Sequence, residues 1–281
     1  MSNHNDTKVW LITGSSTGFG RALTEAVLKN GYRVVATARK PEQLSDLIEH
    51  YPGQVKAIRL DVTKKQEVRD AIRSATETFS RIDVLVNNAG YGTVGAIEEV
   101  SDDAIERQFA TNVFGALNAM RAVLPLMREQ RRGHILNISS VGGFVSFPGS
   151  GIYCSTKFAL EGLSEALAKE VAPLGIKVTI VEPGAFRTDF SGRSLSTPDQ
   201  QIDDYAATSG EFVKWAQEMD GKQPGDPNKA AKAMIQAVES DKPPLRLALG
   251  EDAVNAINEK LESVKAELDA WKQVSVETAF E

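Results

Sequence analysis

Short apolar runs that alternate with longer amphipathic segments constrain the fold of this 281-residue chain more than any other feature. The runs are rich in Val, Ile and Leu: Val9–Thr13, Arg33–Ala38, Val55–Leu60, Val84–Asn87, His134–Ile138 and Lys177–Val181. Strands without polar alternation are buried on both faces, as in a parallel sheet. The segments between them have apolar residues three and four positions apart, which predicts helices at Gly20–Asn30, Lys64–Ser80, Asp102–Arg131 and Ile152–Ala172. This alternation predicts an α/β fold with a doubly wound parallel sheet.

The alternation ends after Pro183. Residues 189–225 are too few for a core of their own, so we expect a substrate-binding lid with a helix near Gly210–Met219. Residues 226–281 are expected to form a helix, a strand and a charged terminal helix, at Asp226–Glu239, Leu245–Leu249 and Asp252–Trp271. Residues 1–281 are therefore predicted to form a single domain.

Composition excludes several classes of protein. Hydrophobic residues make up 42% and charged residues 25%, as in ordinary soluble globular proteins. The net charge of −6 repels phosphodiester backbones, so nucleic acid is not an expected partner. The single cysteine, Cys154, rules out a disulfide framework and a Cys-rich zinc site, and no metal is expected. The polar start Met1–Lys8 and the lack of a long apolar stretch predict a cytoplasmic protein without membrane association.

A glycine-rich turn, Thr13 to Gly20, joins the first strand to the first helix with the spacing G-x-x-x-G-x-G. Glycines let the backbone approach a pyrophosphate, which binds the free N–H groups at the helix N-terminus. Many strand–helix turns need a glycine for geometry alone, but the position after the first strand favours dinucleotide binding. The predicted cofactor residues here are Gly14, Ser16, Thr17, Gly18, Phe19 and Gly20.

The end of the second strand indicates which dinucleotide is bound. Proteins that prefer NAD usually have an acidic residue there, which binds the ribose 2′-hydroxyl. This chain has Ala38 followed by Arg39 and Lys40. A guanidinium suits the 2′-phosphate of NADP, although a solvated basic pair is the alternative interpretation. The missing acid favours NADP(H) over NAD(H).

Three residues predict the chemistry. Ser140 ends the fifth strand, and the next helix has Tyr153 and Lys157 on one face, four residues apart. A Tyr-x-x-x-Lys pair also occurs by chance, so the serine at the strand end is what makes it informative. Hydride transfer between carbon and nicotinamide requires a proton at the substrate oxygen, and a nearby ammonium lowers the pKa of tyrosine from about 10. The serine hydroxyl can hold the carbonyl oxygen.

Together these motifs, with Asn-Asn-Ala-Gly at Asn87–Gly90, resemble those of the short-chain dehydrogenase/reductase family from Lys8 to about Thr188. The resemblance implies a Rossmann-like fold with residues 8–188 as the cofactor-binding and catalytic core. It implies that Tyr153 is the general acid/base, and that Lys157 is its partner and also holds the nicotinamide ribose. It also implies that Ser140 binds substrate and that Asn112 anchors a water-linked proton relay. Asn112 is alternatively a polar helix residue bonded to the backbone.

The same resemblance implies further cofactor contacts. They are Asp61 and Val62 at the adenine, Asn88, Ala89 and Gly90 beside the cofactor, Pro183 and Gly184 after the sixth strand, and Thr188 at the carboxamide. Asp61 is alternatively, or additionally, the N-cap of the following helix. Three substitutions depart from the commoner family residues: Phe19 for Ile, Ser155 for Ala and Thr156 for Ser.

The substrate site is expected to be apolar. Phe144, Phe186 and Phe190 are expected to join Ser140 and Tyr153, with Tyr91, Val141, Val145 and Trp215 as further candidates. Such a wall suits a small hydrophobic ketone, aldehyde or alcohol, although several of these side chains could instead fill the core or a subunit interface.

The alternatives are a redox sensor that binds NADP(H) without turnover, an NAD-dependent alcohol dehydrogenase and an acyl-carrier ketoreductase. The presence of all four catalytic residues favours an enzyme over a sensor. The acidic charge balance disfavours docking of an acidic carrier. The helices Asp102–Arg131 and Ile152–Ala172 hold more apolar residues than one sheet face covers, which predicts a homodimer or homotetramer.

Overall fold

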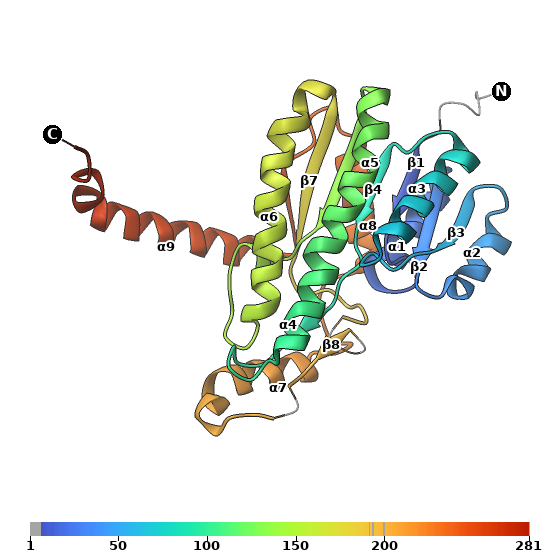
Figure 1. Cartoon of the computed structure of the whole chain (residues 1–281). Helices are drawn as coiled ribbons and strands as arrows, with labels where there is room; N and C mark the ends of the chain where they lie inside the picture. Colours follow the sequence, from blue (N-terminus) through green and yellow to red (C-terminus); the bar gives the residue numbers. More distant parts are fainter. Residues whose placement is uncertain (1–6, 191, 193, 199, 281) are drawn as a thin grey trace.

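The computed structural model describes residues 7–190, 192, 194–198 and 200–280, and within these residues a seven-stranded parallel sheet forms the centre (Figure 1). Its strands are β1 (Val9–Ile12), β2 (Arg33–Ala38), β3 (Val55–Arg59), β4 (Val84–Asn87), β6 (Gly133–Ile138), β7 (Ile176–Pro183) and β9 (Arg246–Leu249). Their order is β3-β2-β1-β4-β6-β7-β9. The chain crosses the sheet between β3 and β4, so β1 and β4 are the neighbours at which the winding direction changes. A crevice at the carboxyl ends of these two strands is where such sheets bind ligands.

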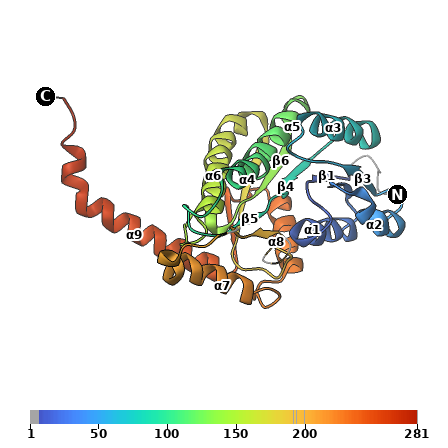
Figure 2. The ribbon, with the colours of Figure 1, turned by 60° about the horizontal axis from the view of Figure 1, so that its bottom comes forward.

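Helices cover both faces of the sheet, as the apolar periodicity predicts (Figure 2). One face carries α3 (Lys65–Phe79), α4 (Asp102–Phe109), α5 (Ala116–Gln130) and α6 (Gly151–Val171). The other carries α1 (Gly18–Lys29), α2 (Ser45–His50) and α8 (Pro227–Glu239).

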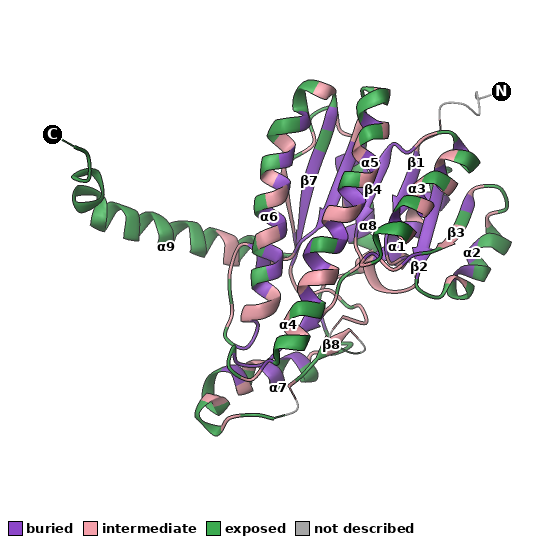
Figure 3. Ribbon diagram, viewed as in Figure 1, coloured by how far each residue is buried: buried purple, intermediate pink, exposed green. Residues whose placement is uncertain are grey.

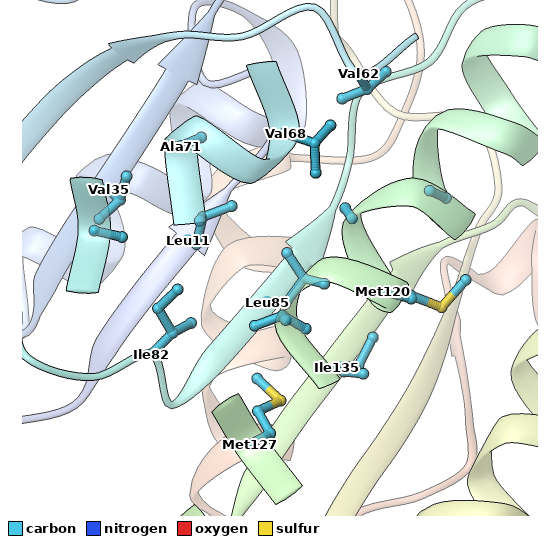
Figure 4. Close-up of a cluster of buried hydrophobic side chains, with 14 of the residues drawn as sticks. Leu11, Val35, Val62, Val68, Ala71, Ile82, Leu85, Met120, Met127 and Ile135 are labelled. Carbon is cyan, nitrogen blue, oxygen red and sulfur yellow. The ribbon is translucent and has the colours of Figure 1, made fainter. Parts of the chain in front are cut away.

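Two hydrophobic cores lie between the sheet and these layers. Side chains from α3 and α5 meet those of the strands in the first core, where Val68 and Met120 lie near Leu11, Leu85 and Ile135 (Figure 4). The second core joins α1 and α8 to the opposite face through residues that include Leu23, Val27 and Met234. The central strands are buried along their length (Figure 3). This burial supplies the main stabilisation of the sheet and therefore fixes the strand ends on which the site is built.

The segment predicted as one helix, Asp102–Arg131, contains a π-helical turn at Ala110–Gly115 between α4 and α5. The wider turn places Asn112 in the interior, 2% exposed, where its side chain hydrogen-bonds to the backbone of Tyr91. Turns of this kind are frequent at functional sites. A 3₁₀ turn at Pro41–Leu44 and helix α2 were not predicted, because the segment is too short for a clear periodicity.

The region after β7 extends from the carboxyl edge of the sheet. Its strand β8 (Leu195–Ser196) pairs with β5 (Gly92–Thr93), and α7 (Glu211–Glu218) follows a second π-helical turn at Ala206–Gly210. Residues 191, 193 and 199 of the predicted lid lie outside the described residues. The chain then returns through α8 to β9, which pairs with β7 and belongs to the central sheet.

The last helix, α9 (Glu251–Val276), projects from the body of the molecule (Figures 1 and 2). It is longer than the predicted Asp252–Trp271. Neither α9 nor any other helix in the described part of the chain combines the length and apolar character needed to cross a bilayer.

Candidate active site

The glycine-rich turn leaves open space in front of α1. Gly14 and Gly18 have φ angles of +71° and +56°, which a side chain would strain. A methyl group on Gly20 would clash with the Gly14 carbonyl oxygen and lie 2.5 Å from Asn88 Nδ2. Because α1 begins at Gly18, its first backbone N–H groups are not used within the helix. The turn therefore fits a dinucleotide pyrophosphate.

Thr13 ties this turn to the end of β4. Its hydroxyl accepts hydrogen bonds from the backbone N–H groups of Asn88 (2.9 Å) and Ala89 (3.0 Å) and donates to the Val86 carbonyl (3.2 Å). The Asn88 side chain in turn donates to the carbonyl oxygens of Thr13 (2.9 Å) and Gly14 (3.0 Å). Thr13 is not among the residues predicted to act in the site, although a hydroxyl residue at the strand end just before Gly14 was a usable signal. It acts by positioning the two loops that flank the crevice.

The part of the predicted cofactor site that would bind adenine lies at the ends of β2 and β3. Ala38 is buried at the end of β2, and Arg39 and Lys40 follow it on the surface. Burial is the largest influence on the pKa of Asp61 and raises it, while the charges of Lys64 and Arg39 have the smallest influence and lower it. Hydrogen bonds from the Thr63 backbone N–H and hydroxyl also favour the carboxylate, and together these effects place the Asp61 pKa below its ordinary value.

The capping interpretation of Asp61 is wrong. Helix α3 is preceded by Lys64 in the N-cap position, and Asp61 accepts hydrogen bonds from Thr63 instead. Val62 is buried and packs so closely on Gly115 that a methyl group there would lie 2.5 Å from Val62 Cγ2. The loop after β3 is thus packed against the start of α5.

Ser140, Tyr153 and Lys157 meet at the carboxyl end of β6. The Ser140 side chain hydrogen-bonds to Tyr153, and its Oγ also accepts from the Gly142 N–H at 3.0 Å. Lys157 Nζ lies 5.6 Å from the centre of the Tyr153 ring and donates to the Ile138 carbonyl at 2.8 Å. The arrangement places two hydroxyl groups side by side with an ammonium one helical turn away.

Burial controls the proton affinities in this group. It raises the pKa of Tyr153, and the hydrogen bond with Ser140 only partly opposes this. The expectation that the Lys157 ammonium lowers the pKa of Tyr153 is therefore wrong in direction for the protein without cofactor, because burial is the largest effect. Burial lowers the pKa of Lys157 to about 8, while the nearby Glu161 carboxyl acts in the opposite direction. Tyr153 therefore keeps its proton at neutral pH.

Asn112 occupies the π-helical turn beside this group. Its Nδ2 donates to the Tyr91 carbonyl (2.9 Å) and to Thr156 Oγ1 (3.1 Å), and its Oδ1 accepts from the Tyr91 N–H (3.1 Å). A methyl group on Gly90 would lie 3.1 Å from Asn112 Oδ1 and 3.8 Å from Lys157 Nζ. The amide is therefore near the ammonium as well as bonded to backbone, so the two interpretations of Asn112 are compatible.

The loop after β7 closes the other side of the crevice. The Gly184 N–H donates to the Leu249 carbonyl at 2.9 Å, which keeps Pro183 and Gly184 beside β9. Asp252, at the start of α9, accepts from the Ala185 N–H at 2.6 Å. A methyl group on Gly18 would lie 3.5 Å from Thr188 Cβ, so Thr188 faces the glycine-rich turn.

The structure separates the three phenylalanines predicted to line the substrate site. The Phe190 ring lies 5.3 Å from the Tyr153 ring. Phe186 packs on Phe19 of α1 at 5.1 Å, and Phe144 lies under the Arg246 guanidinium at 5.9 Å. Phe190 is therefore the member of this set that the ring contacts place at the predicted acid/base.

Aromatic residues also meet farther out. Trp215 and Phe212 on α7 are 5.5 Å apart, and Phe212 stacks on Phe147 at 6.4 Å. Phe147, Tyr205 and Ile97 help to line a hollow of about 600 Å³ between the loop before α6 and the segment before α7. Trp215 thus belongs to an aromatic cluster beside this hollow.

Comparisons with known proteins agree with this geometry. A family model described as short chain dehydrogenase matches residues 8–199. The chain belongs to the short-chain dehydrogenase family. It is 42% identical to "Oxidoreductase BOA17" of Botryotinia fuckeliana over 97% of this chain and 100% of that one. It is 40% identical to a 3-ketodihydrosphingosine reductase of Bacteroides thetaiotaomicron, over 86% and 88% of the two chains.

Solved structures of short-chain dehydrogenases share the fold. One from Streptomyces avermitilis is 47% identical, with a TM-score of 0.91 and coverage of 98% of this chain and 99% of that chain. More distant members have been solved with their cofactors. ElxO, at 29% identity and a TM-score of 0.74 over 89% and 99% of the two chains, has NADP bound. A 3-ketoacyl-(acyl-carrier-protein) reductase from Brucella melitensis is complexed with NADH. It is 27% identical, with a TM-score of 0.72 and coverage of 87% of this chain and 96% of that chain. These relatives support a nicotinamide cofactor for this short-chain dehydrogenase.

An ionic cluster joins α6 to β7 and β9 in this short-chain dehydrogenase. Arg246 of β9 forms ion pairs of 3.2 Å with Glu161 and Glu182 and of 3.3 Å with Glu165. Burial raises the pKa of both Glu161 and Glu182, that of Glu182 to about 7 with a further contribution from Glu161. Glu161 lies one turn after Lys157 and raises the pKa of its ammonium, so the cluster influences this group. Sequence spacing did not point to it, because its members come from three separate elements.

Proposed function

We propose that this short-chain dehydrogenase interconverts a small hydrophobic ketone or aldehyde and the corresponding alcohol, with NADP(H) as cofactor. The observation that carries the proposal is the pair of hydroxyl groups of Ser140 and Tyr153 at the end of β6, with the Lys157 ammonium one helical turn away. Two adjacent hydroxyl donors suit a carbonyl oxygen that gains negative charge during reduction.

In the reducing direction, Ser140 and Tyr153 hold the substrate oxygen through their hydroxyl groups. The bound cofactor supplies the hydride for reduction and accepts it in oxidation. Tyr153 gives its proton to the oxygen of the former carbonyl, and its raised pKa keeps that proton in place until charge develops there. Lys157, with a pKa of about 8, is mostly charged at neutral pH and stabilises the phenolate that remains. Asn112 bonds to the backbone of Tyr91, next to Gly90 at this ammonium, and so fixes a polar path along which Tyr153 regains a proton.

The preference for NADP(H) over NAD(H) is supported by charge. Arg39 follows β2 on the surface and acts on Asp61 at the end of β3, so it lies where the adenine ribose is expected. Ala38 provides no carboxylate to repel a 2′-phosphate. Lys40 adds a second positive charge next to it.

The substrate class is supported by the surroundings of Tyr153. The Phe190 ring, 5.3 Å away, gives the reacting carbon an apolar neighbour. The name of the Bacteroides relative, a 3-ketodihydrosphingosine reductase, describes a ketone with a hydrophobic chain. Both favour a hydrophobic carbonyl compound over a polar one.

We also place this enzyme in the cytoplasm as a homodimer or homotetramer. Phe114 and Phe158 are 55% and 44% exposed on the helical layer of α4, α5 and α6. Phe114 also lines a surface hollow of about 530 Å³ with Ile105 and Phe109. Exposed aromatic residues around such a hollow are typical of a protein–protein contact.

The test is Tyr153→Phe, which removes the hydroxyl and keeps the ring. We expect NADPH to bind as to the wild type by fluorescence titration, while kcat for a panel of hydrophobic ketones falls by about 10²–10⁴-fold because the proton donor is lost. Tyr51→Phe, at the end of α2, is the matched control and should retain wild-type kcat. A Tyr153→Phe enzyme with more than about a tenth of wild-type kcat contradicts the mechanism. A wild-type protein that binds NADPH but turns over none of the panel supports the redox-sensor alternative.

A further inference from the structure

Helix α9 leaves the body of the protein after its first turn. Ala253 is buried and Ile257 half-buried, but the apolar side chains beyond them face solvent, among them Leu268 at 62% and Trp271 at 65% exposure. Both views of the ribbon show the helix extending outward from the sheet and its covering helices (Figures 1 and 2). Its 26 residues span about 39 Å. Because helices in proteins are stabilised mostly by packing of an apolar face, this length calls for a partner.

The apolar residues of α9 form a regular seam. Val254, Ile257, Leu261, Val264, Leu268 and Trp271 are separated alternately by three and four positions. This is the a and d pattern of a two-helix coiled coil, with Val254, Leu261 and Leu268 at a and the others at d. The seam excludes charged residues, which occupy the flanking and outer positions of the helix.

We propose that α9 pairs with α9 of a second copy of this chain in an antiparallel coiled coil. In an antiparallel pair an a residue of one helix faces a d residue of the other. The seam is symmetric in this sense about its midpoint between Glu262 and Ser263. Three facing pairs, each occurring twice, then include every member of the seam: Val254 with Trp271, Ile257 with Leu268, and Leu261 with Val264. The large Trp271 thereby faces the small Val254, which evens out the volume along the seam.

Charges beside the seam favour the same orientation. In the antiparallel register Lys260 of one copy lies beside Glu267 of the other, and symmetry gives this pair twice. In a parallel pair Lys260 would instead lie beside Lys265 of the second copy and repel it. In the parallel pair this repulsion would cancel the attraction of Glu267 for Lys272, whereas the antiparallel pair has only the attraction of Lys260 for Glu267, so these charges favour the antiparallel arrangement.

A membrane surface is a less suitable partner for the apolar seam of α9 than a second copy of the helix. The range Glu251–Val276 contains six acidic and three basic residues, a net charge of −3. Amphipathic helices that bind anionic membranes have polar faces rich in Lys and Arg. This helix would be repelled by such a surface, whereas in the antiparallel pair the opposite charges of Lys260 and Glu267 lie beside each other.

The first test measures the mass of the full chain in solution. Leu268→Lys places a charge in the seam, and light scattering at micromolar concentration should give half the number of chains per particle found for wild type. Ser263→Lys adds the same charge on the outer side of α9 and should leave the number unchanged. Limited proteolysis should leave the same folded core in all three proteins, because Leu268 is exposed in the single chain. The helical circular dichroism signal should fall in Leu268→Lys alone, because α9 then lacks its partner. Equal masses for wild type and Leu268→Lys overturn the proposal, as does a wild-type monomer, whether or not it sediments with anionic vesicles.

The second test separates the two orientations. Lys260→Glu should weaken the association of copies about tenfold in the antiparallel arrangement, because two attractive pairs become repulsive. Lys260→Glu with Glu267→Lys should restore it. An association strengthened by the single change indicates a parallel pair and overturns the proposed orientation. In addition, an oxidised equal mixture of Val254→Cys and Trp271→Cys chains should give crosslinked heterodimers, whereas a parallel pair would give crosslinked homodimers.

Discussion

Replacing Lys157 by Met should make the protein more stable at neutral pH while it abolishes turnover. The ammonium of Lys157 is buried, and its pKa of about 8 lies well below the value of 10.5 for an exposed lysine. A lysine whose pKa is lowered in the folded state opposes folding wherever it must be charged. Met has a similar length and no charge, so it removes this opposition.

The size of the effect follows from the pKa difference. The difference between about 8 and 10.5 corresponds to about 3 kcal/mol of the free energy of unfolding below pH 8. Met also loses the 2.8 Å hydrogen bond to the Ile138 carbonyl, which costs about 1 kcal/mol. The variant should therefore be more stable by about 2 kcal/mol at pH 7. Between about pH 8 and 10.5 the folded wild type binds fewer protons than the unfolded chain, so its stability rises and the difference shrinks towards zero near pH 9.5.

Urea unfolding followed by circular dichroism, at one chain concentration, measures the stability difference between the two proteins at pH 7 and at pH 9.5. Lys169→Met is the control on the same helix. Lys169 is exposed and paired with Glu165, so its loss should change stability by less than about 0.5 kcal/mol at either pH. The reasoning is refuted if Lys157→Met is less stable than wild type at pH 7, or if the difference is the same at both pH values.

Two further predictions concern the cofactor. Ala38→Asp with Arg39→Ala should reverse the preference in kcat/KM from NADPH to NADH, because an Arg–phosphate contact contributes about 1.5–3 kcal/mol to binding. Steady-state kinetics with both cofactors test this. A wild type that already prefers NADH contradicts the prediction. Gly20→Ala should weaken NADPH binding and lower stability by about 1–3 kcal/mol, because its methyl group clashes with the Gly14 carbonyl. A thermal melt with and without NADPH measures both effects. An unchanged NADPH affinity in Gly20→Ala would mean that the turn does not approach the cofactor.

Local sequence signals were sufficient to predict a structural feature where one segment of the chain carries all the information about it. The apolar runs coincide with strands of the central sheet, and the fold and the family are confirmed. A continuous run such as Val34–Ala36 has no polar side to expose, so burial on both faces is its stable outcome. Tyr153 and Lys157 were predicted to share a face because helical spacing alone places them together.

Predictions failed where a residue from another element decides the local structure or the proton affinity. Periodicity continues through Asp102–Arg131, but the structure has a π-helical turn within this segment, where Asn112 bonds to Tyr91, 21 residues earlier. Asp61 has the spacing of a cap, yet Thr63 supplies its partners. Charge alone predicts a lowered pKa for Tyr153, whereas desolvation by the surrounding chain raises it.

The sequence by itself therefore determined the layers, the strand-end position of the site and the chemical identity of its groups, because periodicity and motif spacing act over a few residues. Only the tertiary structure decided which groups meet. It places Phe190 at Tyr153 while Phe186 contacts Phe19, and it brings Arg246 to Glu161, one turn after Lys157. Such contacts join residues that are far apart along the chain, and the free energies of burial and pairing that shift proton affinities exist only once the elements have packed.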